Sequence, residues 1–292
     1  MPTIDELLHG VALRSHGPSG FVVNPLQYYG DGGGAARSAV SRVVFGGQLL
    51  AQAIAIAGHA AEGQFVRSVS IDFVRVAVVD HELTAGVDIV KRGASVSNIR
   101  VTFSQAGKVC ALASVLCVAD FDDQLALGQR PPVAGGPGDH GAVISVFRGY
   151  ERAFLDGDGV WDGSVGPPAT VLWVRFPGGP HTGTTGQGLL SLVTVPFLVD
   201  VALRPFDGLS AARAHTSLST AVLSHGITFH HPVDAAGWHL VDLHATAVAG
   251  GGGYGRGAVF DGRGTLVASF HQDMMIRTLG GDAGSDREGT QL

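Results

Sequence analysis

Residues 43–60 decide the fold, and they read Val-Val-Phe-Gly-Gly-Gln-Leu-Leu-Ala-Gln-Ala-Ile-Ala-Ile-Ala-Gly-His-Ala. From Gln48 to Ala57 nearly every residue is apolar or alanine, and the leucines and isoleucines recur at helical spacing. A helix that is apolar almost all round is a buried helix, so this pattern predicts a central helix that other elements enclose. Gly46 and Gly47 open it and have no Cβ, so a ligand or another backbone can approach its first free N–H groups.

Four extended segments follow this helix: Val66–Val79, Leu83–Lys91, Ser97–Ser104 and Val109–Ala119. Their residues alternate as in half-buried strands, and the turn at residues 105–108 joins the last two segments as a hairpin. One helix followed by four antiparallel strands therefore makes a self-contained unit.

The same order of elements returns in the second half of the chain. An almost entirely apolar segment, Leu189–Leu203, follows a loop rich in glycine and threonine at Gly178–Gly188, and Pro196 must lie in its first turns or kink it. The strands expected after it are Ser219–Phe229, His239–Val248, Tyr254–Phe260 and Thr265–Ile276. The repeat predicts an α+β protein in which two antiparallel sheets, each curled around a central helix, join edge to edge.

The domain boundary is expected in residues 121–141, where paired aspartates, paired prolines and a glycine-rich run predict a linker. We therefore expect an N-terminal unit at 1–120 and a C-terminal unit at 142–279. The last residues, 280–292, are polar and rich in glycine, which predicts a disordered tail.

Composition excludes several classes of protein. Of the 292 residues, 15% are charged, the formal net charge is -6 and the basic residues are scattered, so nucleic acid is not an expected partner. The longest apolar run is about half the length of a membrane span, and the acidic start lacks a signal pattern. We expect a soluble, cytoplasmic protein without a membrane span, in which Cys110 and Cys117 are buried free thiols.

Several short motifs carry a resemblance to a known family. They are residues 44–53 at the start of the central helix, Arg92–Ser97 before a strand, Phe229-His230-x-Pro232 with Trp238, Gly255-Arg256-Gly257, and Leu266–Ser269 with Gln272. In this order and spacing the chain resembles the double-hotdog acyl-CoA thioesterase II family, across both halves. The resemblance implies a double-hotdog fold and hydrolysis of a fatty acyl-CoA to free acid and CoA, without metal, cofactor or covalent intermediate. It also implies a homodimer or a higher homo-oligomer.

The same resemblance suggests which residues form the site. In that family an aspartate on the second helix, a threonine or serine on the next strand and a glutamine on the final strand hold a water against the thioester carbonyl. Gln272 falls on the glutamine. The aspartate position falls near Val195, with Thr194 beside it and Asp200 later in the same segment.

The hydroxyl position falls near Val222, and both Thr220 and Ser224 are two residues away. Because side chains in a strand alternate with a period of two, these residues are expected on the same face of the strand as Val222. We therefore take Gln272, Asp200 and Thr194 as candidate catalytic residues. The candidate substrate-binding residues are Gly46, Gly47, Gln48 and Ser224.

Two other functions remain possible from the sequence. A chain that has lost the aspartate and the hydroxyl would bind acyl-CoA without hydrolysing it. Residues 24–27, Asn-Pro-Leu-Gln, have a superficial likeness to a motif of hotdog enoyl hydratases, but Gln27 stands where the base histidine would be, so a turn is favoured.

Two further sets of polar residues have simpler explanations. Ser70 and Asp72 form a hydroxyl and carboxylate pair on a strand, where a solvent-facing stripe is the favoured interpretation. The histidines of the second half do not predict a metal site. His230 and His231 must point to opposite faces of a strand, and no carboxylate or cysteine completes a set.

Overall fold

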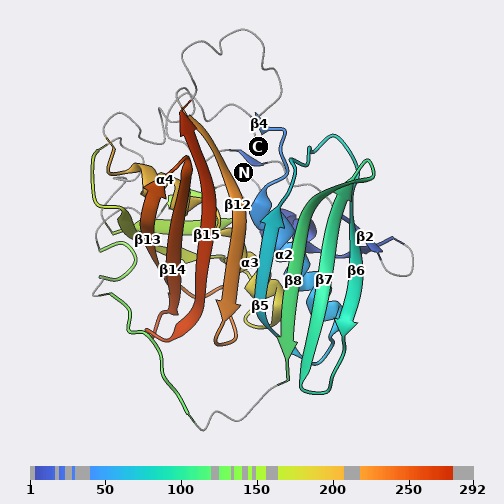
Figure 1. Cartoon of the computed structure of the whole chain (residues 1–292). Helices are drawn as coiled ribbons and strands as arrows, with labels where there is room; N and C mark the ends of the chain where they lie inside the picture. Colours follow the sequence, from blue (N-terminus) through green and yellow to red (C-terminus); the bar gives the residue numbers. More distant parts are fainter. Residues whose placement is uncertain are drawn as a thin grey trace.

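The chain folds into one large antiparallel sheet with its helices on one face (Figure 1). The structure is a computed structural model that describes residues 4–16, 20–23, 28–29, 40–119, 125–132, 135–139, 144–146, 149–155, 164–206 and 218–278. The turn expected at residues 24–27 and the tail expected at 280–292 lie outside these described residues.

The helices are α1 (Ile4–Val11), α2 (Gly46–Ala60), α3 (Gly183–Leu192) and α4 (Phe197–Leu203). The strands follow one another across the large sheet in the order β1-β2-β6-β7-β8-β5-β12-β15-β14-β13-β11-β10-β9. Their bounds are β1 (Arg14–Ser15), β2 (Gly20–Val23), β5 (Phe65–Phe73), β6 (Leu83–Lys91), β7 (Val96–Gln105), β8 (Lys108–Val118), β9 (Ile144–Val146), β10 (Tyr150–Phe154), β11 (Ala169–Arg175), β12 (Leu218–Phe229), β13 (His239–Ala249), β14 (Gly252–Asp261) and β15 (Leu266–Thr278). Two short strands, β3 (Tyr28–Tyr29) and β4 (Val40–Ser41), pair apart from it.

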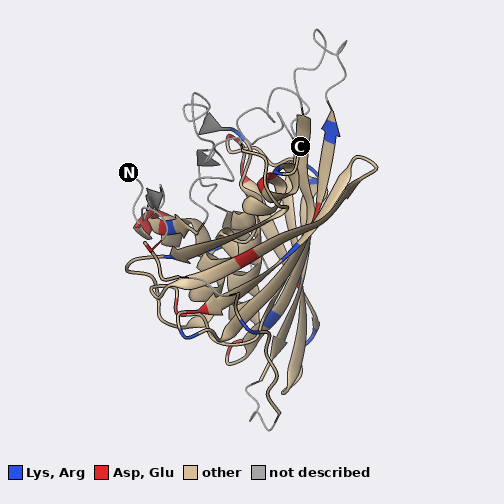
Figure 2. Cartoon of the chain, turned by 90° about the vertical axis from the view of Figure 1, so that its left-hand side faces the viewer, with Lys and Arg blue, Asp and Glu red and all other residues tan. Residues whose placement is uncertain are grey.

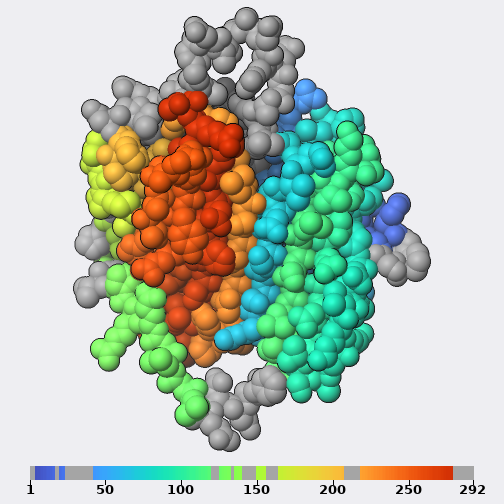
Figure 3. Space-filling model, viewed as in Figure 1, coloured from blue at the N-terminus to red at the C-terminus, as the bar shows by residue number. Residues whose placement is uncertain are grey.

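The two halves of the chain meet where β5 pairs with β12, near the middle of the sheet (Figure 3). Residues 68–72 of β5 run antiparallel to residues 224–228 of β12, so the hydrogen bonds of the sheet continue from one half into the other. On either side of this seam the strand order is the same, β6-β7-β8-β5 and β13-β14-β15-β12. In the described part of the chain, the two expected sheets therefore form one continuous sheet.

The helix α2 is largely buried. Ten of its residues are buried, and it packs against β5, β7, β8 and the helix α3. Figure 2 shows the sheet from its side, with the helices on one face and the charged residues few and scattered. Cys110 and Cys117 are free and buried on β8, as expected.

Gly47 lets α2 and α3 approach closely. A Cβ at Gly47 would lie 2.6 Å from the ring of Phe45 and 3.2 Å from the backbone oxygen of Leu192. The first turn of α2 can therefore lie beside the last residue of α3 only because residue 47 has no side chain.

The second apolar segment is two helices, where the sequence predicts one from Leu189 to Leu203. The helix α3 begins inside the loop expected at Gly178–Gly188 and ends at Leu192, and α4 begins directly after Pro196. Proline has no N–H, and its ring clashes with the carbonyl four residues earlier, so the first helix ends at Leu192.

Residues 183–203 are, by length and composition alone, long and apolar enough to cross a membrane. In the structure 83% of the apolar window is buried inside the protein. The segment is therefore part of the protein core.

Part of the expected linker is attached to the sheet. Trp173, Leu240 and Phe260 lie on neighbouring strands and form an apolar cluster separate from the main core. Trp173 Nε1 donates a hydrogen bond to the backbone oxygen of Gly135 at 2.9 Å. The chain around Gly135 is thus anchored to this second cluster.

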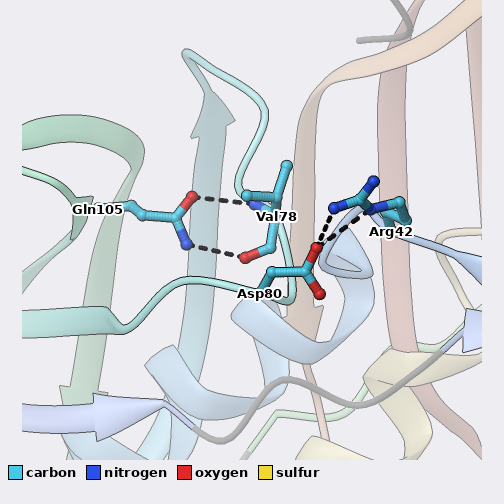
Figure 4. A network of polar contacts seen from close by, with 4 residues as sticks. All are labelled: Arg42, Val78, Asp80 and Gln105. Atoms are coloured by element: carbon cyan, nitrogen blue, oxygen red, sulfur yellow. Dashed lines mark hydrogen bonds and ion pairs between the residues drawn. The ribbon is translucent and has the colours of Figure 1, made fainter.

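Gln105 holds the loop that supports the start of α2 (Figure 4). Its side chain accepts a hydrogen bond from the Val78 N–H at 3.0 Å and donates to the backbone oxygens of Val78 and His81 at 2.8 and 2.9 Å. Val78 in turn bridges to Val43, directly before the helix. An ion pair between Arg42 and Asp80 closes the same loop at the surface.

We expect Gln105→Leu to lower the free energy of unfolding by about 2–4 kcal/mol, because three part-buried hydrogen bonds to the backbone would be lost. Arg42→Ala is the matched control in the same loop. Its ion pair is exposed, so we expect a loss of less than about 1 kcal/mol. Urea unfolding followed by circular dichroism measures both losses, and equal losses would contradict this account of the loop.

Candidate active site

Three buried polar side chains form a chain of hydrogen bonds in the second half. Thr194 comes from the turn between α3 and α4, His225 from β12 and Gln272 from β15. Thr194 Oγ1 lies 3.1 Å from His225 Nε2, and His225 Nδ1 lies 3.1 Å from Gln272 Oε1. The exposed fraction of each side chain is 0%. Two of the three candidate catalytic residues, Thr194 and Gln272, are therefore linked through a histidine.

The break before Pro196 places Thr194. The last turn of α3 is tight, and the Thr194 N–H bonds to the backbone oxygen of Ser191 at 3.2 Å, three residues back. The Thr194 hydroxyl lies 2.9 Å from the same oxygen. If α3 continued past Leu192, the Thr194 side chain would point in another direction. Pro196 ends the helix and so sets the direction of this hydroxyl.

A β-bulge at Leu223 decides which residues of β12 face the core. The register between β12 and β15 shifts between Val222 and Ser224, which leaves Leu223 as the extra residue. Beyond the bulge, His225 lies directly opposite Gln272, and residues opposite each other in a sheet share a face.

The bulge corrects one expectation from the sequence. Strand alternation predicts Ser224 on the same face as Val222, but the structure places it on the opposite face, because the extra residue reverses the alternation. Ser224 Oγ donates a hydrogen bond to Asp273 Oδ2 at 3.0 Å on the exposed side. The structure therefore does not bring this candidate substrate-binding residue to Gln272.

Burial keeps His225 neutral. It lowers the pKa of the imidazole from 6.5 to about 4, against a smaller rise from the Gln272 hydrogen bond, while the charge of His271 lowers it further. The ring stacks on Phe270, with 5.6 Å between centroids and 25° between planes. A Cβ at Gly257 would lie 2.2 Å from the Phe270 ring, so the stack requires glycine at that position of β14.

The Gln272 amide nitrogen has no hydrogen-bond partner among the described residues, although it is buried. The other buried glutamines all donate from this atom to backbone oxygens: Gln48, Gln52, Gln105 and Gln187. An unpaired buried donor costs about 1–3 kcal/mol, so its presence calls for a partner other than the described residues. Among the residues that the structure describes, Gln272 Nε2 is therefore the unpaired hydrogen-bond donor of the site.

Asp200 is not part of this chain of hydrogen bonds. It lies on α4, where it is partly buried and its backbone oxygen accepts from the Arg204 N–H at 3.1 Å. Val195, at the aspartate position, has an exposed fraction of 2% and packs in the main core. Neither Asp200 nor Val195 therefore has a hydrogen bond to Gln272, His225 or Thr194 in the described part of the chain.

The start of α2 serves the packing of helices. Gln48 is buried and donates from Nε2 to the backbone oxygen of Gly10 at 3.1 Å, which ties α2 to the end of α1. A Cβ at Gly46 would lie 2.9 Å from the ring of Phe73. Gly47 lies against Leu192, two residues before Thr194, so the candidate substrate-binding glycines lie at the end of α3 that leads into the site.

Sequence reasoning missed His225 as a site residue and considered it only for metal. The signal was its position in a strand, because His225, Ile227 and Phe229 alternate and all three are buried. A histidine on the buried face of a strand needs polar partners, which Thr194 and Gln272 provide. Within the described ranges, no group of three or more His, Cys, Asp or Glu residues is placed to hold a metal ion.

Ser70 and Asp72 lie on the outer face of the sheet. Asp72 pairs with Ser224 across the seam, on the side away from His225. A groove of about 280 Å³ follows the same seam. Its lining includes the polar residues Ser68, Ser70, Asn98, Ser114, Thr228 and His271.

Known structures have the same fold. The tesB protein of Mycobacterium avium subspecies paratuberculosis is 22% identical, with a TM-score of 0.75 over 94% of this chain and 99% of that chain. A protein of unknown function with a hot dog fold, from Alicyclobacillus acidocaldarius, is 17% identical, with a TM-score of 0.73 over 93% of this chain and 97% of that chain. The fold is thus a hotdog-like thioesterase fold.

The sequence models of two domains define the family. The acyl-CoA thioesterase N-terminal domain matches residues 35–118, and the acyl-CoA thioesterase C-terminal domain matches residues 125–276. Acyl-CoA thioesterase 2 of Haemophilus influenzae is 24% identical over 259 residues, which are 81% of this chain and 88% of that protein. The chain belongs to the acyl-CoA thioesterase family, and the expectation of a thioester hydrolase is confirmed at this level.

Proposed function

We propose that the protein hydrolyses a fatty acyl-CoA to free fatty acid and CoA by direct attack of water, at the site formed by Thr194, His225 and Gln272. The observation that carries this proposal is the buried Gln272 amide, whose nitrogen lacks a partner among the described residues while its oxygen lies 3.1 Å from His225 Nδ1. A preorganised donor in a buried site is suited to the charge that develops on a thioester carbonyl oxygen.

The reaction needs no covalent intermediate. The water oxygen bonds to the carbonyl carbon, the C–S bond breaks, one proton goes to the sulfur of CoA and the other leaves with the acid. The neutral groups of the site fix the positions of the water and the carbonyl, which is a large part of the catalytic effect in such reactions. Neither Thr194 nor Gln272 carries a charge, so we assign Gln272 the role of a hydrogen-bond donor and Thr194 that of a positioning residue.

A second function is supported by a specific observation. By the family resemblance, the positions of the aspartate and the hydroxyl fall near Val195 and Val222, and the side chain of neither valine can hydrogen-bond a water. A chain with this pair of substitutions would bind acyl-CoA and release it unchanged.

We also propose how the fold serves this site. The units 1–120 and 142–279 are two hotdog units, with α2 and the α3–α4 pair as their central helices, and the pairing of β5 with β12 supports this division. In this proposal the protein is cytoplasmic and forms a homodimer or a larger homo-oligomer, while Gly46, Gly47 and Gln48 lie near the bound thioester.

The test is release of free thiol from acetyl-CoA, octanoyl-CoA and palmitoyl-CoA, followed with a thiol-reactive chromophore. We expect release from at least one of the longer substrates. Calorimetric binding of the same compounds separates the two functions, because a silent protein binds them without release. Neither binding nor release would overturn both.

A further inference from the structure

We propose that His225 is a positioning residue: it holds the Gln272 amide with Nε2 directed at the substrate carbonyl, and Thr194 selects the His225 tautomer that does so. No residue of the family's catalytic trio supplies this function. The part of the inference that concerns the substrate rests on the proposed function, whereas the arrangement of protons within the three side chains does not.

Counting protons shows which group donates in each hydrogen bond between Thr194, His225 and Gln272. A neutral imidazole has one N–H and one bare nitrogen. Gln272 Oε1 can only accept and lies 3.1 Å from His225 Nδ1, so the ring proton belongs on Nδ1. His225 Nε2 is then the acceptor, and the hydroxyl that faces it at 3.1 Å is that of Thr194.

The Thr194 hydroxyl is able to be this donor. Its one proton has two acceptors within hydrogen-bond distance, the backbone oxygen of Ser191 at 2.9 Å, which also accepts from the Thr194 N–H, and His225 Nε2 at 3.1 Å. Because Gln272 Oε1 requires the ring proton on Nδ1, we assign the hydroxyl proton to His225 Nε2. If the hydroxyl proton instead went to Ser191, the ring proton would move to Nε2 and bare Nδ1 would require the amide of Gln272 to turn over. Gln272 would then present its oxygen to the substrate in place of its nitrogen.

The two arrangements have opposite consequences. With Nε2 of Gln272 directed at the substrate, the site offers a donor to the carbonyl oxygen, where negative charge develops. With the oxygen directed there, the site would repel that charge. The Thr194–His225 contact thus determines the chemical character of a residue that Thr194 does not touch, and the apolar surroundings strengthen the effect because water does not compete.

The tautomer can be measured without any turnover. Long-range proton–nitrogen correlation spectra of the 15N-labelled protein at about pH 7 distinguish the two neutral tautomers, and comparison with His225→Asn assigns the signal. We expect the form with the proton on Nδ1. A proton on Nε2, or a charged ring, would overturn the inference whether or not the protein hydrolyses acyl-CoA.

A matched pair of variants tests the effect on catalysis. An asparagine amide at residue 225 occupies the place of Nδ1 and can still donate to Gln272, whereas a glutamine amide reaches the place of Nε2 and meets Thr194. With octanoyl-CoA, we expect His225→Asn to keep at least about tenfold more kcat than His225→Gln, while KM changes less than about threefold in both. Equal kcat values would overturn the inference, because a purely structural role predicts losses that follow stability.

The failures of the two proposals can be told apart. If the native protein releases no thiol from any of the acyl-CoAs, the proposed function fails and the tautomer still decides the arrangement of the three side chains. If the native protein is active and the two variants are equal, the function stands and the positioning role fails.

Discussion

Replacing Gln272 with alanine lowers kcat for acyl-CoA hydrolysis by about 100-fold or more and leaves KM nearly unchanged, because it removes a donor that acts mainly in the transition state. The side chain is fully buried, and its open Nε2 is held in place by His225. Steady-state thiol release with octanoyl-CoA measures both constants.

Ser224→Ala is the control on the same sheet. Ser224 is one residue from His225 in sequence but lies on the opposite face, bonded to Asp273. We expect its kcat within about twofold of the native value, since it touches neither Gln272 nor the core. If Asp200→Asn abolishes release while Gln272→Ala does not, the site lies on α4 and our assignment is wrong.

The elements with a strong local pattern were predictable. The apolar run of α2 and the alternation along β6, β7 and β8 are set by burial on one face or on all sides, and burial is written directly into residue type. The place of Gln272 on the final strand was predictable for another reason, because it follows a sequence motif. The position of Thr194 beside Pro196 is also local.

The bulge at Leu223 could not be predicted from its own residues. Leu223 itself is a common strand residue, and the bulge arises from the register that β12 adopts between β5 and β15. A single extra residue exchanged the faces of Ser224 and His225. The sequence therefore pointed to a serine where the fold provides a histidine.

The start of α3 was not predicted from the sequence, for a related reason. Gly183, Gly186 and Gly188 make the segment read as a loop, because glycine disfavours a helix by about 1 kcal/mol per residue. In the fold Gly186 and Gly188 let α3 lie close to Val233 and Ala51, and Gln187 donates to the backbone oxygen of Val66 at 2.7 Å. Contacts between the halves outweigh the local preference.

Acid should destabilise the native protein through His225. The pKa of this side chain is about 4 in the folded protein and 6.5 when it is exposed. Between about pH 6.5 and pH 4 the imidazole is therefore protonated in the unfolded chain but stays neutral in the folded chain. Stability is therefore unaffected by this group at higher pH and falls as the pH drops from about 6.5 toward 4. The full difference corresponds to about 3 kcal/mol.

The comparison with His225→Asn isolates this contribution. His230 and His239 also have pKa values lowered by burial, but they are present in both proteins, so their effects cancel in the difference. At about pH 7 we expect the variant to be less stable, since it loses the stack on Phe270 and the contact with Thr194. As the pH falls to about 4.5, we expect the difference in unfolding free energy between the native protein and His225→Asn to narrow by about 2 kcal/mol. The reason is that asparagine does not titrate, so only the native protein loses stability through this residue. A difference that stays constant over this range would mean that the pKa of His225 is the same in the folded and unfolded protein, and would contradict the burial of a neutral ring. The folded ring would then be charged below about pH 6.5, and a charged ring has two N–H groups and cannot accept the hydrogen bond from Thr194.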